Sequence, residues 1–234
     1  MTIHETALPW PQTWREDDRL TRSSLFSYRC GFCSSCCRAK LIQVNPYEIA
    51  WLAAHLGIST TECIAEYLDG VYLRRHEDGT CIFLNEKGCR VHAARPLVCR
   101  LYPLGRHVDA SGAESFGHVP PMPQTLGAYG EHSTVQDWIA AQGAQPFIDA
   151  VDAYLDLFHR LFKMIEEHEG SAQGVDDWPQ NAGAASMPRW MDIDLTLTDR
   201  ADATGAIDRR MRLHIRVLEK RFGLDAERSG RLPP

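Results

Sequence analysis

The segment Cys30-Gly31-Phe32-Cys33-Ser34-Ser35-Cys36-Cys37 is the part of the sequence on which the expected fold depends, because it places four thiols within eight residues. Its Gly and Ser content favours a loop over a helix or a strand. Steps of three residues let a tightly wound loop direct several thiols to one centre. Three further cysteines follow singly, at Cys81, Cys89 and Cys99. We therefore expect one metal-binding module between Cys30 and Cys99.

Two metals fit this pattern of thiols. Iron–sulfur proteins of the ferredoxin type use a C-x2-C-x2-C run. Structural zinc sites also use C-x2-C but usually repeat it downstream, and this sequence has no second C-x2-C. Iron, held as an iron–sulfur cluster or as a multi-iron thiolate site, is therefore preferred, and zinc is the alternative.

Cys36 and Cys37 are adjacent, and neighbouring side chains point apart in most backbone conformations. We therefore expect them to face different sites, unless one of them is not a ligand. One site could combine Cys30, Cys33 and Cys36 with a downstream cysteine. A second could combine Cys37 with two downstream cysteines and leave a position open to His92, water or substrate, as catalytic metal sites do.

The composition is that of an ordinary globular protein, with 234 residues, 44% hydrophobic and 24% charged. The net charge of −6 argues against an extended nucleic-acid footprint, although a local basic patch stays open. No run approaches the roughly 18 apolar residues of a membrane span, and the N-terminus has no secretory pattern. We therefore expect a cytoplasmic protein with no membrane partner. In that reducing compartment, eight cysteines favour metal ligation over four disulfides.

Capping signals, apolar spacing and turn residues predict several helices and little sheet. The predicted helices span about 46–57, 59–70, 96–103, 133–143, 146–169 and 205–222. Asp78-Gly79 predicts a hairpin turn within residues 71–84, and Asn85 to Gly88 predicts a second turn. The expected fold class is α+β, a small cysteine-rich metal-binding core with a short hairpin, flanked by several helices.

Other candidate residues are weaker. Arg95 and Arg100 flank Cys99, and could either bind the anionic cofactor or substrate or form a salt bridge or a carbonyl clamp. His92 is the best histidine candidate for a metal ligand, followed by His118 and His107. Cys63 lies on the apolar side of a predicted helix, and we expect it in the core.

The cysteines and the residues between them resemble the YkgJ-like CxxCxxCC family, whose domain is described as zinc- or iron-chelating. The resemblance covers about residues 25–105 and includes Phe83-Leu84, Arg95-Pro96 and Arg100 to Pro103. It implies that the family's metal-binding cysteines are Cys30, Cys33, Cys36, Cys37, Cys81, Cys89 and Cys99. His92 stands where the family usually has an aromatic residue such as Tyr. A related domain occurs in flagellin lysine methylases, where an iron–sulfur centre is implied.

The expected organisation is an N-terminal arm (1–24), the CxxCxxCC metal-binding domain (25–105), a helical extension (106–170), a linker (171–190) and a C-terminal helical segment (191–234). The leading hypothesis is a cytosolic iron protein serving redox or group-modification chemistry on an unknown protein or small-molecule substrate. It could then be an iron-dependent oxidoreductase or a modifying enzyme. The alternatives are a zinc-stabilised interaction module without catalysis and a metal sequestration or delivery protein.

Overall fold

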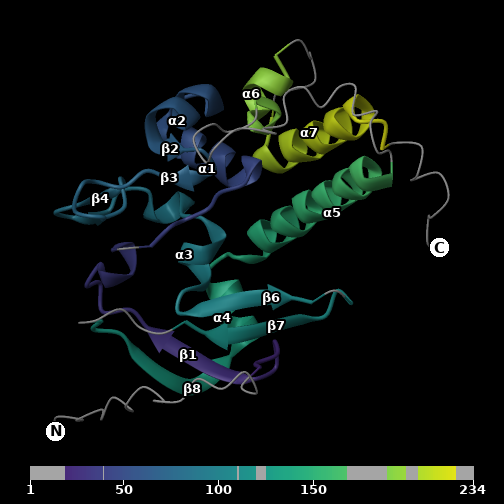
Figure 1. Cartoon of the computed structure of the whole chain (residues 1–234). Helices are drawn as coiled ribbons and strands as arrows, with labels where there is room; N and C mark the ends of the chain where they lie inside the picture. The colour runs from purple at the N-terminus through teal and green to yellow at the C-terminus, as the bar shows by residue number, and fades with distance from the viewer. Residues whose placement is uncertain are drawn as a thin grey trace, which may run out of the picture. The chain divides into compact units, whose positions relative to one another are not determined.

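The computed structural model describes residues 19–38, 40–109, 111–119, 125–167, 189–198 and 205–224 (Figure 1). The chain forms two compact units. Unit 1 comprises the described parts of Met1–Lys40, His76–Arg90 and Pro96–Pro146, and unit 2 those of Leu41–Arg75, Val91–Arg95 and Phe147–Pro234. Most of the predicted arm, with Trp10 and Trp14, and residues 171–188 of the predicted linker lie outside the described residues. The mixture of helices and short antiparallel strand pairs confirms the α+β class.

Within its described residues, unit 1 contains three antiparallel strand pairs (Figure 1). Strand β1 (Leu25–Arg29) pairs with β8 (Ala128–Thr134), β4 (Leu84–Asn85) with β5 (Gly88–Cys89), and β6 (Leu104–Val108) with β7 (Glu114–His118). Its helical parts are the 3-10 turn η1 (Ser35–Cys37) and helices α3 (Leu97–Leu101) and α4 (Val135–Ala141). The β4–β5 pair confirms the turn predicted at Asn85 to Gly88.

Strands β6, β7 and β8 occupy a region that the sequence predicted as the start of a helical extension, and only its second half is helical. The turn after β6 explains the difference. Asp109 Oδ1 accepts hydrogen bonds from the backbone N–H groups of Ser111 (2.8 Å) and Ala113 (3.0 Å), and Gly112 takes a φ of 84°. A carboxylate that holds its own turn and a glycine in the left-handed region together favour chain reversal over helix.

Packed aromatic rings fill the interior of unit 1 between β1, β8 and α4. Phe26 and Tyr28 of β1 lie edge-on to Trp138 of α4, with ring centroids 5.7 and 6.0 Å away. Tyr28 also faces Tyr129 of β8, its directly paired residue, at 5.0 Å. The Trp138 indole N–H donates to the carbonyl of Leu101 at 3.1 Å. These contacts fix the end of α3, the helix that carries Cys99, against the sheet.

Unit 2 is mainly helical. It contains α1 (Pro46–Leu56), α2 (Thr60–Tyr67), almost all of α5 (Gln145–Glu167), α6 (Ile193–Thr196) and α7 (Ile207–Arg221), with the small pair β2 (Leu68–Asp69) and β3 (Tyr72–Leu73) and the 3-10 turns η2 (His92–Ala94) and η3 (Arg189–Met191). Capping boxes at Asn45 and Ser59 start α1 and α2 as predicted, and Gly57, with a φ of 72°, ends α1. The long helix, the last helix and α3 also match their predicted positions.

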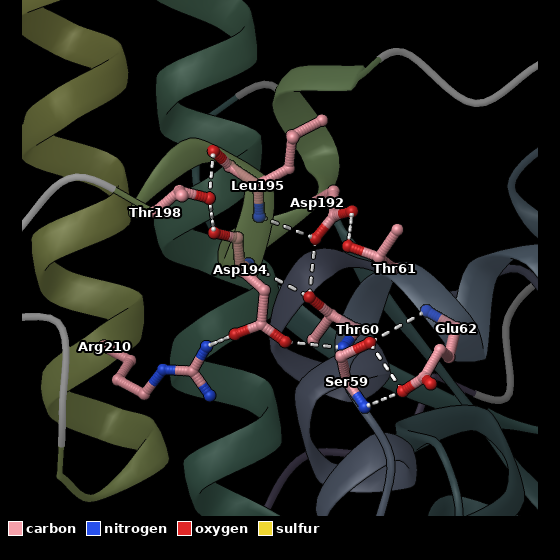
Figure 2. A network of polar contacts seen from close by, with 9 residues as sticks. All are labelled: Ser59, Thr60, Thr61, Glu62, Asp192, Asp194, Leu195, Thr198 and Arg210. Atoms are coloured by element: carbon pink, nitrogen blue, oxygen red, sulfur yellow. Dashed lines mark hydrogen bonds and ion pairs between the residues drawn. The ribbon is translucent and has the colours of Figure 1, made fainter.

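A buried polar network ties the start of α2 to α6 and α7 within unit 2 (Figure 2). Asp192 is 4% exposed and accepts hydrogen bonds from the hydroxyls of Thr60 and Thr61, both at 2.6 Å. Asp194 accepts from the Thr60 backbone N–H at 2.6 Å and pairs with Arg210 of α7. Because the buried carboxylate of Asp192 has several donors, its burial is compensated.

The hairpin predicted across Asp78-Gly79 is confirmed at its turn. Gly79 has a φ of 79° and the His76 N–H donates to the Thr80 carbonyl at 2.8 Å. Further from the turn, Tyr72–Leu73 pairs with Leu68–Asp69, and Thr80 also forms a bridge with Arg38. The arms of the predicted hairpin therefore have partners that the sequence did not predict. Among the described residues, no helix is long and apolar enough to cross a membrane.

Candidate metal centre

All seven cysteines of the predicted metal-binding set belong to unit 1, whereas Cys63 belongs to unit 2. Six of the seven are partly exposed and Cys30 is exposed, so each is reachable from solvent. Cys63 is 0% exposed, which confirms that it is a core residue. Burial, with the nearby Glu66, raises the pKa of the Cys63 thiol to about 12. A thiol in that environment is a poor ligand, because metals bind the thiolate.

We call residues 30–34 the outer loop. Backbone N–H groups point at the sulfurs of its two cysteines, Cys30 and Cys33. The N–H of Phe32 donates to Cys30 Sγ at 3.4 Å and the N–H of Leu126 donates to Cys33 Sγ at 3.5 Å. Burial raises the pKa of Cys33, but hydrogen bonds from Ser35 and Leu126 outweigh it, so the net pKa is lowered. Donors of this kind stabilise a thiolate, which is the state that a metal ligand requires.

The backbone of the outer loop is wound tightly enough to need special conformations. Phe32 and Ser34 have φ values of 54° and 57°, in the left-handed region that residues with a side chain rarely adopt. Gly31 packs against Leu126 so closely that a Cβ there would lie 2.4 Å from the Leu126 carbonyl oxygen. Strain of this kind persists where the surroundings fix it, and it is concentrated here between consecutive cysteines.

The sulfurs of Cys36 and Cys37 lie 4.0 Å apart, which differs from the expectation that these neighbours point apart. The 3-10 turn η1 contributes to the difference, because successive side chains of a 3-10 helix are rotated by about 120° from each other, whereas those of a strand point to opposite faces. Two thiolates bound tetrahedrally to one ion at about 2.3 Å would lie about 3.8 Å apart. The pair therefore suits a shared metal ion, and adjacency alone no longer requires two separate sites.

The downstream cysteines lie around this pair. The N–H of Cys81 donates to the Cys37 carbonyl at 2.9 Å, Cys89 ends β5, and Cys99 lies in α3. The hydrogen bond to Cys36, burial and the charges that Cys36, Cys89 and Cys99 would carry all raise the pKa of Cys37. Burial, and then the charges of Cys89 and Cys36, raise the pKa of Cys81. We call these five residues the inner cysteine group: Cys36, Cys37, Cys81, Cys89 and Cys99.

The structure brings the inner cysteine group within electrostatic range but does not arrange it as a finished site. Among the described residues, no three His, Cys, Asp or Glu side chains are positioned to hold a metal ion. Convergence of the outer loop with the inner group stays a prediction. The chemistry of the donors nevertheless fits iron or zinc, because both metals accept all-thiolate coordination.

The arginines proposed as cofactor-binding residues both contact backbone carbonyls. Arg100 is 7% exposed and donates from Nη1 to the Gln142 carbonyl at 2.9 Å. Arg95 donates from Nη1 to the His92 carbonyl at 2.6 Å. These contacts match the carbonyl clamp that the sequence left open as their alternative role. A part in binding an anionic cofactor stays a prediction for both residues.

The histidine candidates lie in different surroundings. His92 belongs to unit 2, with its Nδ1 3.3 Å from Arg95 Nη1. His118 packs against the rings of Phe26 and Tyr129, with centroids 5.7 and 5.9 Å away, and His107 is exposed on β6. A ligand role for the three histidines stays a prediction.

Lys40 is a residue near the cysteines that sequence reasoning missed. Its ammonium lies 3.9 Å from the centroid of the Tyr102 ring. Burial lowers the pKa of Lys40, while the neighbouring Cys36, Cys99 and Cys37 act in the opposite direction. The position of Lys40 three residues after Cys37 was the one sequence signal for a role near the cysteines. That signal is weak, because a lysine close to a cysteine in sequence need not lie close to it in the fold.

Comparisons with known proteins agree with this site. Residues 29–120 match the family described as "CxxCxxCC: Putative zinc- or iron-chelating domain". An uncharacterized protein of Methanocaldococcus jannaschii is 34% identical over 83 residues, which are 33% of this chain and 44% of that protein. The chain thus spans less than half the length of this curated relative. No solved structure matches the chain significantly. The resemblance recognised from the cysteine motif is confirmed: residues 29–120 match the CxxCxxCC family, and the description of that family supports binding of zinc or iron.

Proposed function

We propose that the chain is an iron protein whose cysteines hold an iron–sulfur cluster or a multi-iron thiolate site. The observation that carries the proposal is the inner cysteine group. Cys37 lies within electrostatic range of Cys36, Cys89 and Cys99, and Cys81 lies within range of Cys36 and Cys89. These are five thiols, whereas one tetrahedral zinc ion takes only four ligands. The outer loop adds two more thiols with N–H donors to sulfur. Such a surplus suits a polynuclear site better than a single zinc ion.

The residues that would hold the iron are the seven cysteines of unit 1. Thiolate-bound iron supplies one-electron redox chemistry. The N–H groups of Phe32 and Leu126 would stabilise the outer thiolates, and the η1 turn would present Cys36 and Cys37 together. On this proposal the protein is an oxidoreductase or a modifying enzyme of the cytoplasm, acting on a protein or a small molecule. Neither a membrane nor nucleic acid is an expected partner.

Zinc is the second candidate, because the family description names it beside iron. It would make the domain a non-catalytic interaction module. The spacing of Cys36 and Cys37 also suits one zinc ion. A third candidate, metal sequestration or delivery, predicts that a chelator removes the metal under mild conditions.

The experiment is purification of the full chain under anaerobic conditions, followed by metal and acid-labile sulfide analysis. Iron in excess of one per chain, with a brown colour and with or without sulfide, supports the proposal. Stoichiometric zinc without iron after expression in iron-replete medium would refute it in favour of the zinc module. The matched control is Cys30→Ser/Cys33→Ser, which should lose part of the metal and keep the inner group's share.

A further inference from the structure

Lys40 is a half-buried cation whose polar surroundings are unusual. Its ammonium lies over the Tyr102 ring at 3.9 Å from the centroid, a cation–π contact. Cys36, Cys37 and Cys99 lie within electrostatic range of the ammonium. All of these residues belong to unit 1. The ammonium therefore contacts an aromatic face, and three members of the inner cysteine group lie close enough to act on its charge.

A half-buried ammonium is costly unless a negative charge accompanies it. We find no carboxylate paired with Lys40 among the residues that the structure describes, and the acidic groups that act on it are thiols. Neutral thiols would leave the cation uncompensated, whereas thiolates would compensate it. Cysteine side chains are held as thiolates when they bind metal. Binding of a metal to these cysteines would therefore make the placement of Lys40 more favourable.

We infer that Lys40 balances the negative charge of the metal-bound thiolates of Cys36, Cys37 and Cys99, and that the Tyr102 ring holds it in place. Lys40 is a positioning residue, because it acts through the cysteines. The inference deepens the proposed metal site and depends on it, but it holds for iron and for zinc. Groups of this kind around a metal site change metal affinity by about 10- to 100-fold when they are removed.

The position of Tyr102 supports this role. Tyr102 directly follows α3, the helix that carries Cys99, so the ring and the thiol are placed by the same element. Its ring also lies edge-on to Tyr28 of β1, with centroids 6.2 Å apart. An aromatic face fixed from two sides can orient a flexible lysine side chain without neutralising its charge. A carboxylate in that position would compete with the thiolates for the ammonium.

The test compares metal affinity in purified full-length variants by competition with a chromophoric chelator. Lys40→Met removes the charge and keeps the length, and Lys40→Arg keeps the charge. Tyr102→Phe keeps the ring, whereas Tyr102→Leu removes it. Lys220→Met is the matched control, because it makes the same change in net charge at an exposed residue of α7 in unit 2. We expect Lys40→Met to lose about 10- to 100-fold in affinity, Tyr102→Leu to lose less, and Lys40→Arg, Tyr102→Phe and Lys220→Met to stay near wild type.

Thermal melting of the chelator-treated proteins separates charge balance from a general structural role. If the Lys40 charge is uncompensated without metal, metal-free Lys40→Met should have a melting temperature no lower than that of metal-free wild type. Unchanged metal affinity in Lys40→Met would overturn the inference, and so would equal loss in Lys40→Arg. If Lys40→Met does not fold, Lys40→Gln replaces it, and failure of both neutral variants without metal would also overturn the inference. Wild type that binds no stoichiometric metal would instead refute the proposed function itself.

Discussion

The buried imidazole of His214 should make the stability of unit 2 depend on pH. His214 lies on α7 and is 0% exposed. Its Nε2 is 2.8 Å from the Trp190 carbonyl, which can only accept, so Nε2 carries the proton and Nδ1 accepts from the Tyr154 hydroxyl at 2.8 Å. Both nitrogens are therefore satisfied by a neutral ring. Burial lowers the pKa of His214 to about 4, against partial compensation from the Trp190 hydrogen bond and Asp192, while Arg210 lowers it further.

The sign and size follow from linkage. The unfolded chain takes up a proton at this imidazole near pH 6.5, whereas the folded chain does so only near pH 4. The free energy of unfolding therefore falls as the pH is lowered from 6.5 towards 4, and the full contribution is present above pH 6.5. A pKa lowered from 6.5 to about 4 corresponds to about 3 kcal/mol.

The assay is urea unfolding of wild type and His214→Gln between neutral pH and pH 4. Glutamine can donate to the Trp190 carbonyl and accept from Tyr154, but it does not titrate. Because both proteins keep the same cysteines, any pH effect of metal binding is common to them. We expect wild type to lose about 3 kcal/mol more than His214→Gln over this range. Equal losses in the two proteins would refute the assignment of a neutral, buried imidazole.

Three further predictions concern the cysteines, the outer loop and the polar network. Cys99→Ser should lower the metal content, because a ligand is lost. Cys63→Ser should keep the metal and lower the free energy of unfolding by only about 1–2 kcal/mol. Greater metal loss in Cys63→Ser than in Cys99→Ser would show that the cysteines are wrongly sorted. Gly31→Ala should displace Leu126 and weaken the N–H···S contact to Cys33, so metal analysis should show partial loss; unchanged content would contradict this. Thr60→Val leaves buried Asp192 without one donor (Figure 2) and should cost about 1–3 kcal/mol in urea unfolding, whereas the exposed control Thr198→Val should change stability by less than about 0.5 kcal/mol.

The sequence was most informative where the cause of structure is local. Asn45 and Ser59 each carry their capping partner three residues later, so the starts of α1 and α2 were predictable from adjacent residues. The turn at Asp78-Gly79 was predictable for the same reason, but the pairing of its arms was not. Thr80 forms a bridge with Arg38, and Tyr72 pairs with Asp69. No signal in the neighbouring residues predicts these strand partners.

The features of the candidate site also fall into those that local sequence predicts and those that it does not. The motif identified the cysteines and excluded Cys63, because spacing and helix position are written in the chain. It did not reveal that the N–H of Leu126 reaches Cys33 across 93 residues. Nor did it reveal that Lys40 lies over Tyr102, which depends on how the chain after η1 passes the end of α3. Contacts between remote segments thus add to the local donors around the thiols, and these remote contacts follow from tertiary packing.

Charge balance gives one more argument about the number of metal ions. If all seven thiols of unit 1 ligate as thiolates, a single divalent ion sets two positive charges against seven negative ones, and Lys40 adds one positive charge. Partly buried thiols whose pKa values are already raised, such as Cys37 and Cys81, would then protonate instead of ligating. Each additional ion compensates two further thiolates and makes their ionisation less costly. Full use of the seven cysteines therefore favours more than one metal ion, whichever metal is bound, and a single bound ion would leave some of the inner group as ordinary thiols that react with alkylating agents in the holoprotein.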